Sequence, residues 1–521
     1  MLFLNQDKNM MRLMTLLYRH DGEWLKYTEL AREIGISRRT VKTYTENLEK
    51  LFADYSKFEH TGAMLRVSFD GNFGLLTMQK TFLYSSLIVQ IFYKSFFRPN
   101  MDKLDLSMDL NCSVSSIFRN VQLFNEKFAV GYKLRYSYAD LQFTGDERDI
   151  QKFYVNFFIE VLPNPLAWPF EDFFAEEDAK VLTRLAGKYI NKRPFHPAHF
   201  KYMKMALAVA LIRLQQGYAI PINEHNPLFI PRLEKILADP EAQAILDKYA
   251  VDPDSSRLDF LYQLLAYFLS EKFIFFLADP AVPYKNDENY SAQYNYYLEK
   301  VQYLQGKYNI CVSDTETFYN ALYTYFRFKV SNIDASDFFV NHSDYFLNYV
   351  KLLNVDFHNE LITLVEDYLT KFHPHVKDRT KDLAYTVYSL WPDLLPQLMK
   401  NIPPYRALVV SHYDHYYAKT LANLLNCLNP RVLQAEVYQG EEIDLAGLHT
   451  THHEIIITDF AFPNPPEDKL LFNFEQLPSV PNLHKLLLTV TNHMTQRTIE
   501  SAPEEFDDYY HKMIIDKKIR G

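Results

Sequence analysis

The stretch LAREIGISRRTVKTYTENLEKLF, residues 30–52, contains two helical patterns joined by a short turn. Its second half carries apolar side chains three and four residues apart, the buried stripe of an amphipathic helix: Val41, Tyr44, Leu48 and Leu51. Ser37 is a good N-cap for that helix. A shorter apolar pattern precedes it, and Gly35-Ile36-Ser37 supplies the turn between the two. The stretch therefore predicts a helix-turn-helix.

Polar and cationic side chains gather at the start of the second helix and are expected to face outward. Arg39, Lys42 and Thr43 are the outward-facing positions, with Arg38 at the helix start. The candidate DNA-binding residues of this helix are Ser37, Arg38, Arg39, Thr40, Lys42 and Thr43. A recognition helix needs hydrogen-bond donors in its first two turns, where it approaches base edges and phosphates. The alternative is a solvated charged face on an ordinary core helix. The segment FEHTGAMLRVSF (58–69) follows and reads as a hairpin that turns at Thr61-Gly62, which is where a winged version has its wing.

A second copy of this pattern occurs further along the chain. Residues 106–128, LSMDLNCSVSSIFRNVQLFNEKF, align without a gap on residues 30–52 at an offset of 76. Its polar positions, which we expect to face outward or to cap the helix, are Ser113, Ser115, Ser116, Arg119 and Asn120. The segment YKLRYSYADLQFTG (132–145) reads as a second hairpin. Two such units favour DNA binding over a chance core pattern, and the more cationic first unit is expected to read DNA more strongly.

Composition limits the remaining possibilities. The 521 residues suffice for three to five domains, and Gly is scarce, with 13 residues, which disfavours Gly-rich nucleotide loops. Three widely spaced cysteines predict neither disulfides nor a zinc module, and no apolar run suggests a signal peptide or membrane insertion. Residues 1–150 carry a net charge of +2 and the remainder −12. A soluble, cytoplasmic protein whose nucleic-acid contacts lie at the N-terminal end is expected.

Two further regions have different patterns. Residues 150–395 are rich in aromatic residues at helical spacing, are interrupted by Pro-bearing joints, and predict two helical bundles. The last hundred residues predict a small α/β domain. Its expected strands are RALVVS (406–411), RVLQAEVY (431–438), EIIITDF (454–460) and HKLLLTVT (484–491).

This order of elements resembles the Mga and AtxA group of transcription regulators. The resemblance covers essentially the full chain and is most specific at residues 27–69 and 101–145. It implies a mainly α, multidomain protein with five domains. These are a winged helix-turn-helix domain (1–70), a second, Mga-type helix-turn-helix domain (71–160), two all-α bundles like phosphotransferase-system regulation domains, or PRDs (161–285 and 286–398), and a small α/β domain like enzyme IIB (399–521).

The resemblance also implies function and partners. Members of the group are usually activators of virulence, surface-protein or metabolic genes in Gram-positive bacteria. The expected partners are double-stranded promoter DNA, a second copy bound through the C-terminal domain, and proteins of the phosphotransferase system. An RNA-binding antiterminator is an alternative, because such proteins also carry paired regulation domains, although their RNA-binding module is a small β-structure. A scaffold that binds transport proteins without nucleic acid is a third possibility.

Control by histidine phosphorylation is a further implication of the resemblance. In ordinary regulation domains the target histidine commonly lies seven residues before an Arg on the first long helix. Counting back from Arg213 gives Ala206, and counting back from Arg327 gives Asn320, so this sequence departs from the pattern. The nearby candidates are His196, His199, His342 and His358. His199 is preferred because it starts the helix that leads into Arg213; an exposed or capping histidine is the alternative for each.

Catalytic chemistry is not expected. Enzyme IIB uses a Cys at the end of its first strand, followed by a phosphate-binding loop, but here RALVVS runs into HYDHYYAKT, with neither Cys nor Gly. His412, Asp414 and His415, or Thr451-His452-His453, could be imagined as metal ligands, but no spacing completes a set of three. Nucleophile-elbow, zinc-protease and Walker patterns do not occur. We therefore predict no enzyme activity, no cofactor and no metal.

Overall fold

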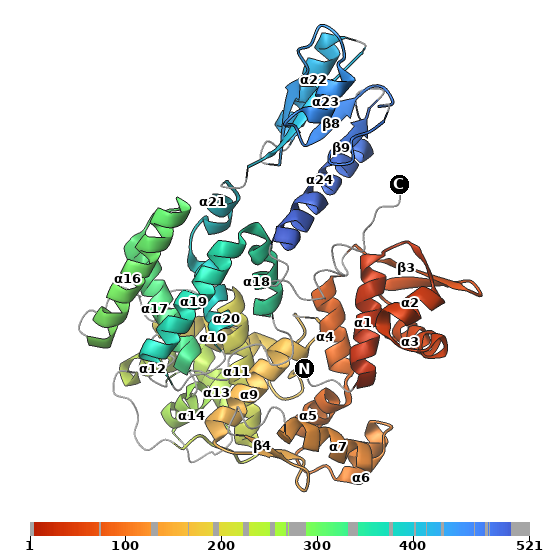
Figure 1. Ribbon diagram of the computed structural model, residues 1–521. Coiled ribbons are helices and arrows are strands. Elements are labelled where there is room, and N and C mark those ends of the chain that lie inside the picture. Colours follow the sequence, from red (N-terminus) through yellow and green to blue (C-terminus); the bar gives the residue numbers. More distant parts are fainter. Residues whose placement is uncertain are drawn as a thin grey trace. The chain divides into compact units, whose positions relative to one another are not determined.

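The computed structural model describes residues 5–501, with short gaps (Figure 1). The gaps are 72–73, 127–133, 165, 191–196, 222–228, 251–255, 267–268, 270–287, 332–341, 375–378, 401–402, 413, 429–431, 463, 475–477 and 479. The chain divides into two units, residues 1–282 with 324–342, and residues 283–323 with 343–521. Each unit is described by itself.

The first unit begins with a winged helix-turn-helix. Its elements are α1 (Asn5–Arg19), β1 (Trp24–Lys26), α2 (Tyr27–Ile34), α3 (Arg38–Leu51), β2 (Ser56–His60) and β3 (Met64–Phe69). The strands form an antiparallel sheet in the order β1-β3-β2, with Phe58 opposite Val67. Val41 and Leu48 are fully buried, and Tyr44 and Leu51 are half-buried against the same core, so the stripe expected for α3 faces the core. The hairpin predicted at residues 58–69 is also confirmed; strand β1 was not predicted.

The second helix-turn-helix has the same plan with a shorter wing. It contains α6 (Lys103–Asp109), α7 (Val114–Phe124), β4 (Arg135–Ser137) and β5 (Gln142–Thr144). Helices α4 (Leu75–Ser85) and α5 (Leu87–Phe97) precede it, and α9 (Glu147–Val161) follows it. β4 and β5 pair antiparallel, so the hairpin predicted at 132–145 is confirmed for its described residues.

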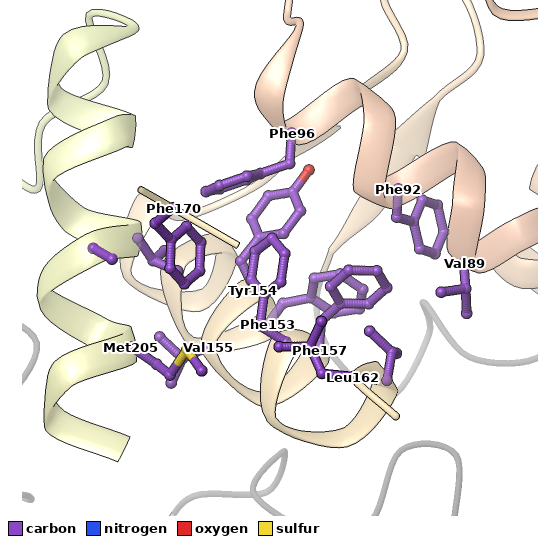
Figure 2. Close-up of a cluster of buried hydrophobic side chains, with 14 of the residues drawn as sticks. Val89, Phe92, Phe96, Phe153, Tyr154, Val155, Phe157, Leu162, Phe170 and Met205 are labelled. Carbon is purple, nitrogen blue, oxygen red and sulfur yellow. The ribbon is translucent and has the colours of Figure 1, made fainter. Parts of the chain in front are cut away.

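Aromatic side chains from α5 and α9 form the core around the second helix-turn-helix (Figure 2). Phe96 lies 4.4 Å from Tyr154, ring centroid to ring centroid, and Phe143 of β5 lies 4.3 Å from Phe153. Aromatic pairs at these distances add stabilisation beyond their buried area. α9 is buried on nearly all of its faces, so the second wing is built directly onto a core helix.

A helical bundle follows within residues 1–282 of the first unit, to which residues 324–331 of α17 (Thr315–Ser331) also belong. It comprises α10 (Glu176–Tyr189), α11 (Pro197–Gln215), α12 (Ile230–Leu237), α13 (Pro240–Tyr249) and α14 (Arg257–Leu265). Arg213 of α11 makes a buried ion pair with Glu147 of α9, 2.6 Å between Nη2 and Oε2. One cluster of buried apolar side chains runs from Met10 to Leu269. The predicted boundaries at residues 70 and 160 therefore fall inside a continuous core, and they stay predictions.

The next helices are α16 (Glu288–Tyr308), α17 (Thr315–Ser331), α18 (His342–Leu353), α19 (Val355–Phe372), α20 (Thr380–Leu390) and α21 (Leu394–Lys400). Tyrosines join α16 to α19: Tyr368 of α19 donates to Gln293 of α16 at 2.7 Å, and Tyr308 of α16 donates to Glu360 of α19 at 2.8 Å. Among the described residues between 150 and 395 no strand occurs, so the helical prediction for this region is confirmed there.

The C-terminal region is a four-stranded parallel sheet with helices. The strands are β6 (Tyr405–Val410), β7 (Leu433–Val437), β8 (Ile455–Thr458) and β9 (Leu470–Asn473), in the order β7-β6-β8-β9. The helices are α22 (His415–Leu428), α23 (Leu445–Thr450) and α24 (Val480–Ser501). Alternate strand residues pack into two apolar clusters, Val409 and Ile457 in one and Leu408 and Ile456 in the other. The α/β prediction and its first three strands are confirmed.

The fourth predicted strand, HKLLLTVT (484–491), is wrong, because this segment lies within α24. Leu486 and Val490 are fully buried while Leu488 is 42% exposed. A strand would place all three side chains on one face, whereas a four-residue spacing puts only Leu486 and Val490 together on a helix. The fourth strand is instead the short β9, which the sequence pattern did not reveal.

Candidate nucleic-acid interface

The turn between α2 and α3 is built as the sequence predicted. α2 ends at Gly35, whose φ of 79° is left-handed, a conformation that glycine adopts without strain. The Ser37 side chain accepts a hydrogen bond from the Thr40 backbone amide at 3.1 Å, which confirms Ser37 as the N-cap of α3. Ser37 and Thr40 also share a hydrogen bond between their hydroxyl groups. These two side chains therefore shape the start of α3.

The first wing is fastened to both helices of its unit. The Arg38 guanidinium donates to the Gly62 carbonyl in the hairpin turn at 3.0 Å. His60 of β2 contacts the Tyr27 hydroxyl at 2.7 Å through Nδ1 and Glu49 of α3 at 3.1 Å through Nε2. Burial raises the pKa of Tyr27, and the nearby Glu49 adds to this effect. Helix α3 and its wing are thus held at a defined spacing.

The remaining predicted residues of α3 form its exposed face. Arg39, Lys42 and Thr43 are all exposed. The Lys42 ammonium lies 5.3 Å from the centroid of the Tyr27 ring, which orients this side chain at the surface. Two cations and a hydroxyl in the first two turns match what phosphate and base contacts require.

In the second helix-turn-helix, some predicted residues lie where they were expected and one does not. Ser113 caps α7 by accepting from the Ser116 amide at 3.1 Å, and Ser115 and Arg119 are exposed. Asn120 was expected to face outward, but it is only 7% exposed and donates to the Ser116 carbonyl at 2.9 Å. A short polar side chain can bond back to the preceding turn, and here that bond removes Asn120 from the surface.

Phe118 is a surface residue of α7 that sequence reasoning missed. It is 47% exposed, and its ring centroid lies 5.1 Å from that of Tyr138, in the turn of the second wing. The Lys103 ammonium lies 4.9 Å from the Tyr138 centroid. The offset of 76 aligns Phe118 with Lys42, so the alignment of the two copies could have identified Phe118 as an outward-facing position. The second face is more aromatic than the first.

Of the four candidate phosphorylation sites, the structure describes the side chain of His358 alone. His199 lies in the first turn of α11 and His342 begins α18, but their side chains are outside the described residues, as is all of His196. His358 is only 8% exposed and contacts the Tyr388 hydroxyl at 3.3 Å through Nδ1. As placed in α19, His358 does not present its ring to another protein.

The loop after β6 is held by a network of hydrogen bonds to Asp459. Asp459, which follows β8, has a fully buried side chain. It accepts from the Ser411 hydroxyl, from the His412 amide at 3.0 Å and from His412 Nδ1 at 2.7 Å. Burial raises the pKa of Asp459, but these hydrogen bonds outweigh burial and hold the pKa below its usual value.

Two helix-turn-helix units, each with a capped second helix and a β-hairpin, define a protein of the DNA-binding class. None of the helices in the described part of the chain has the length and apolar character needed to span a membrane. The cysteines at 112, 311 and 427 are all free thiols.

Comparison with known proteins agrees with this class. Residues 5–59 match the family described as "M protein trans-acting positive regulator (MGA) HTH domain", and residues 71–158 match "Mga helix-turn-helix domain". A "Putative trans-acting regulator" of Streptococcus pneumoniae serotype 4 (strain ATCC BAA-334 / TIGR4) is 22% identical over 496 residues, 93% of this chain and 97% of that protein. These findings support a Mga-like family of transcription regulators for this chain.

Proposed function

We propose that this transcription regulator is an activator that binds promoter DNA in a sequence-specific way, with virulence, surface-protein or carbohydrate-metabolism genes as its targets. The observation that carries the DNA-binding part is the exposed face of α3, with Arg39, Lys42 and Thr43 beside a wing fastened through Arg38 and His60. Cations at the start of a capped helix are suited to phosphate contacts that set its register in the groove.

The second unit would extend the footprint. Arg119 and Lys103 offer phosphate contacts, and the exposed Phe118 offers an apolar surface to thymine methyl groups or sugars. With fewer cations on α7 than on α3, this unit contributes less to the salt-dependent part of the affinity.

A direct comparison of nucleic acids separates DNA binding from the antiterminator alternative. The full-length protein should shift a promoter duplex in a gel at fixed salt and leave an RNA of the same sequence unbound. Preferential binding of the RNA would support the antiterminator, and binding of neither would support a scaffold. Genome-wide mapping of bound DNA, with and without a phosphotransferase sugar, identifies the promoters and the inducing condition.

We further propose that the helical regions 161–285 and 286–398 act as PRD-like domains that respond to phosphotransferase-system proteins. The support is the all-helical build of their described residues and the place of His199 in the first turn of α11. If His199 accepts a phosphoryl group, His199→Asp and His199→Ala should shift transcription in opposite directions, because only the first adds negative charge. Wild-type transcription in both variants would assign His199 a structural role.

The C-terminal region, 399–521, is proposed as an enzyme IIB-like docking domain that has lost its chemistry and joins two copies of the chain. A parallel sheet of this size is consistent with that architecture. Ser411 and His412 stand where a Cys and a small-residue loop would be needed, and both are bonded to Asp459. This arrangement favours binding over phosphoryl transfer through a thiolate.

A further inference from the structure

Three side chains with metal-ligand atoms meet on the C-terminal sheet. Glu436 lies on β7, and His452 and His453 lie in the loop between α23 and β8. One ligand atom from each lies within 4.8 Å of the other two. The sequence pattern does not reveal Glu436 as a third ligand for the two histidines, because Glu436 lies on a separate strand. The parallel order β7-β6-β8 brings the three together.

We propose that Glu436, His452 and His453 bind a divalent transition-metal ion of the Zn²⁺ class. Two imidazoles and one carboxylate are a donor set that Zn²⁺ uses in proteins. Imidazole nitrogen also suits Cu²⁺ and Ni²⁺, whereas Mg²⁺ and Ca²⁺ prefer sites made of oxygen atoms alone.

The distances fit such an ion. Ligand atoms bound to a tetrahedral Zn²⁺ at about 2.0–2.1 Å lie about 3.3 Å apart. His453 Nε2 and Glu436 Oε2 are already 3.2 Å apart. The ring centroids of His452 and His453 are separated by 4.2 Å. His453 is buried, while His452 and Glu436 are exposed, so the two outer ligands can rotate onto an ion held by a fixed inner one.

The surroundings orient His453 for this role. Its Nδ1 lies 2.7 Å from the Thr451 hydroxyl. When Nδ1 carries the proton and donates it to Thr451, the lone pair of Nε2 points toward Glu436. Such an outer hydrogen bond normally fixes the tautomer of a metal-binding histidine. The Lys469 ammonium fixes the backbone of this loop by donating hydrogen bonds to the carbonyls of Thr451 at 2.7 Å and His453 at 3.0 Å.

Charge around the site selects among cations. Lys469 is directed at two backbone carbonyls, and the positive charge of Arg406 acts on His453. Glu436 is the one carboxylate of the set. The site therefore favours an ion held by coordination bonds to imidazole over a hard cation attracted by negative charge. A bound ion would tie β7 to the start of β8 and leave one coordination position open toward the exposed side.

The experiment uses the full-length chain, freed of metal with a chelator and titrated with Zn²⁺ alone by calorimetry in the presence of excess Mg²⁺. The variants are His452→Ala and Glu436→Gln, both at exposed positions where the fold tolerates replacement. The control is His484→Ala, which removes an exposed histidine of α24 outside the cluster. We expect one ion per chain, affinity reduced at least about tenfold in each variant, and no change in the control.

Three results would overturn the proposal: no Zn²⁺ binding tighter than about 0.1 mM, equal affinity in wild type and both variants, or an equal loss in the His484→Ala control. Co²⁺ gives a second readout on the wild-type chain, independent of whether the variants fold. Visible absorption bands of four-coordinate Co²⁺ that Zn²⁺ abolishes would support the site, and their absence would contradict it.

Discussion

The Asp459 carboxylate makes the stability of the C-terminal sheet depend on pH. Its carboxylate is fully buried at the carboxyl edge of the sheet and joins β8 to the loop after β6 through Ser411 and His412. The pKa of this group is depressed in the folded protein. Its contribution to stability is therefore complete above the unfolded pKa of about 3.9 and is lost as the pH falls through the lower, folded pKa.

Replacing Asp459 with Asn should speed hydrogen exchange in β6 and β8 at neutral pH, because the charge-assisted bonds to His412 are lost. The difference from wild type should begin to shrink as the pH falls below about 3.9 and should vanish below the lower, folded pKa of Asp459, where both chains carry a neutral group. Hydrogen-exchange mass spectrometry of peptides from 405–410 and 455–458 measures it, with variant and wild type compared at each pH. A difference that stays constant from neutral to acidic pH would show that the charge of Asp459 is not the cause.

The second helix of each helix-turn-helix could be located from the sequence, but not every exposed side chain on it. Caps and apolar spacing are local, so Ser37, Ser113 and the buried stripes could be predicted. The direction of a side chain depends on what packs around it: Asn120 bonds back to Ser116, and Phe118 leans on Tyr138. The site at Glu436 depends on strand order, which no spacing along the chain encodes.

The apolar residues of α24 follow a helical period, although their sequence pattern predicts a strand. Leu486 and Leu488 would share a face in a strand, but in α24 they do not. Leu486→Ala should lower the free energy of unfolding of the C-terminal region by about 2–5 kcal/mol, because Leu486 is fully buried. Leu488→Ala, the matched control at a 42% exposed position, should change it by about 0.5 kcal/mol or less.

Urea unfolding followed by hydrogen exchange in β6 and β8 gives both values in the same region of the chain. Equal destabilisation by Leu486→Ala and Leu488→Ala would support a strand at residues 484–491 and contradict the helix. Strand β9 could not be predicted from the sequence, because the segment KLLFN (469–473) is too short for its pattern to be distinguished from a loop.

We propose that the whole protein is a dimer, which places two DNA-binding regions on one duplex. Removing residues 404–521 should leave a folded but largely monomeric protein that binds DNA weakly, because two linked readers gain affinity over one. Light scattering of the truncated chain measures its mass, and the circular dichroism of its helices is the control for folding. A truncated dimer as tight as the full-length one would move the interface to the helical regions.

The salt dependence of promoter binding measures whether α3 contacts DNA. Arg39→Ala and Lys42→Ala should each reduce the slope of log affinity against log salt by about 1, since each removes one phosphate contact. The double variant should lose specific binding while keeping its fold, because both side chains are exposed. Lys50→Ala, an exposed lysine in the last turn of α3, should leave the slope unchanged. An unchanged slope and affinity in the double variant would remove the start of α3 from the interface and contradict the account.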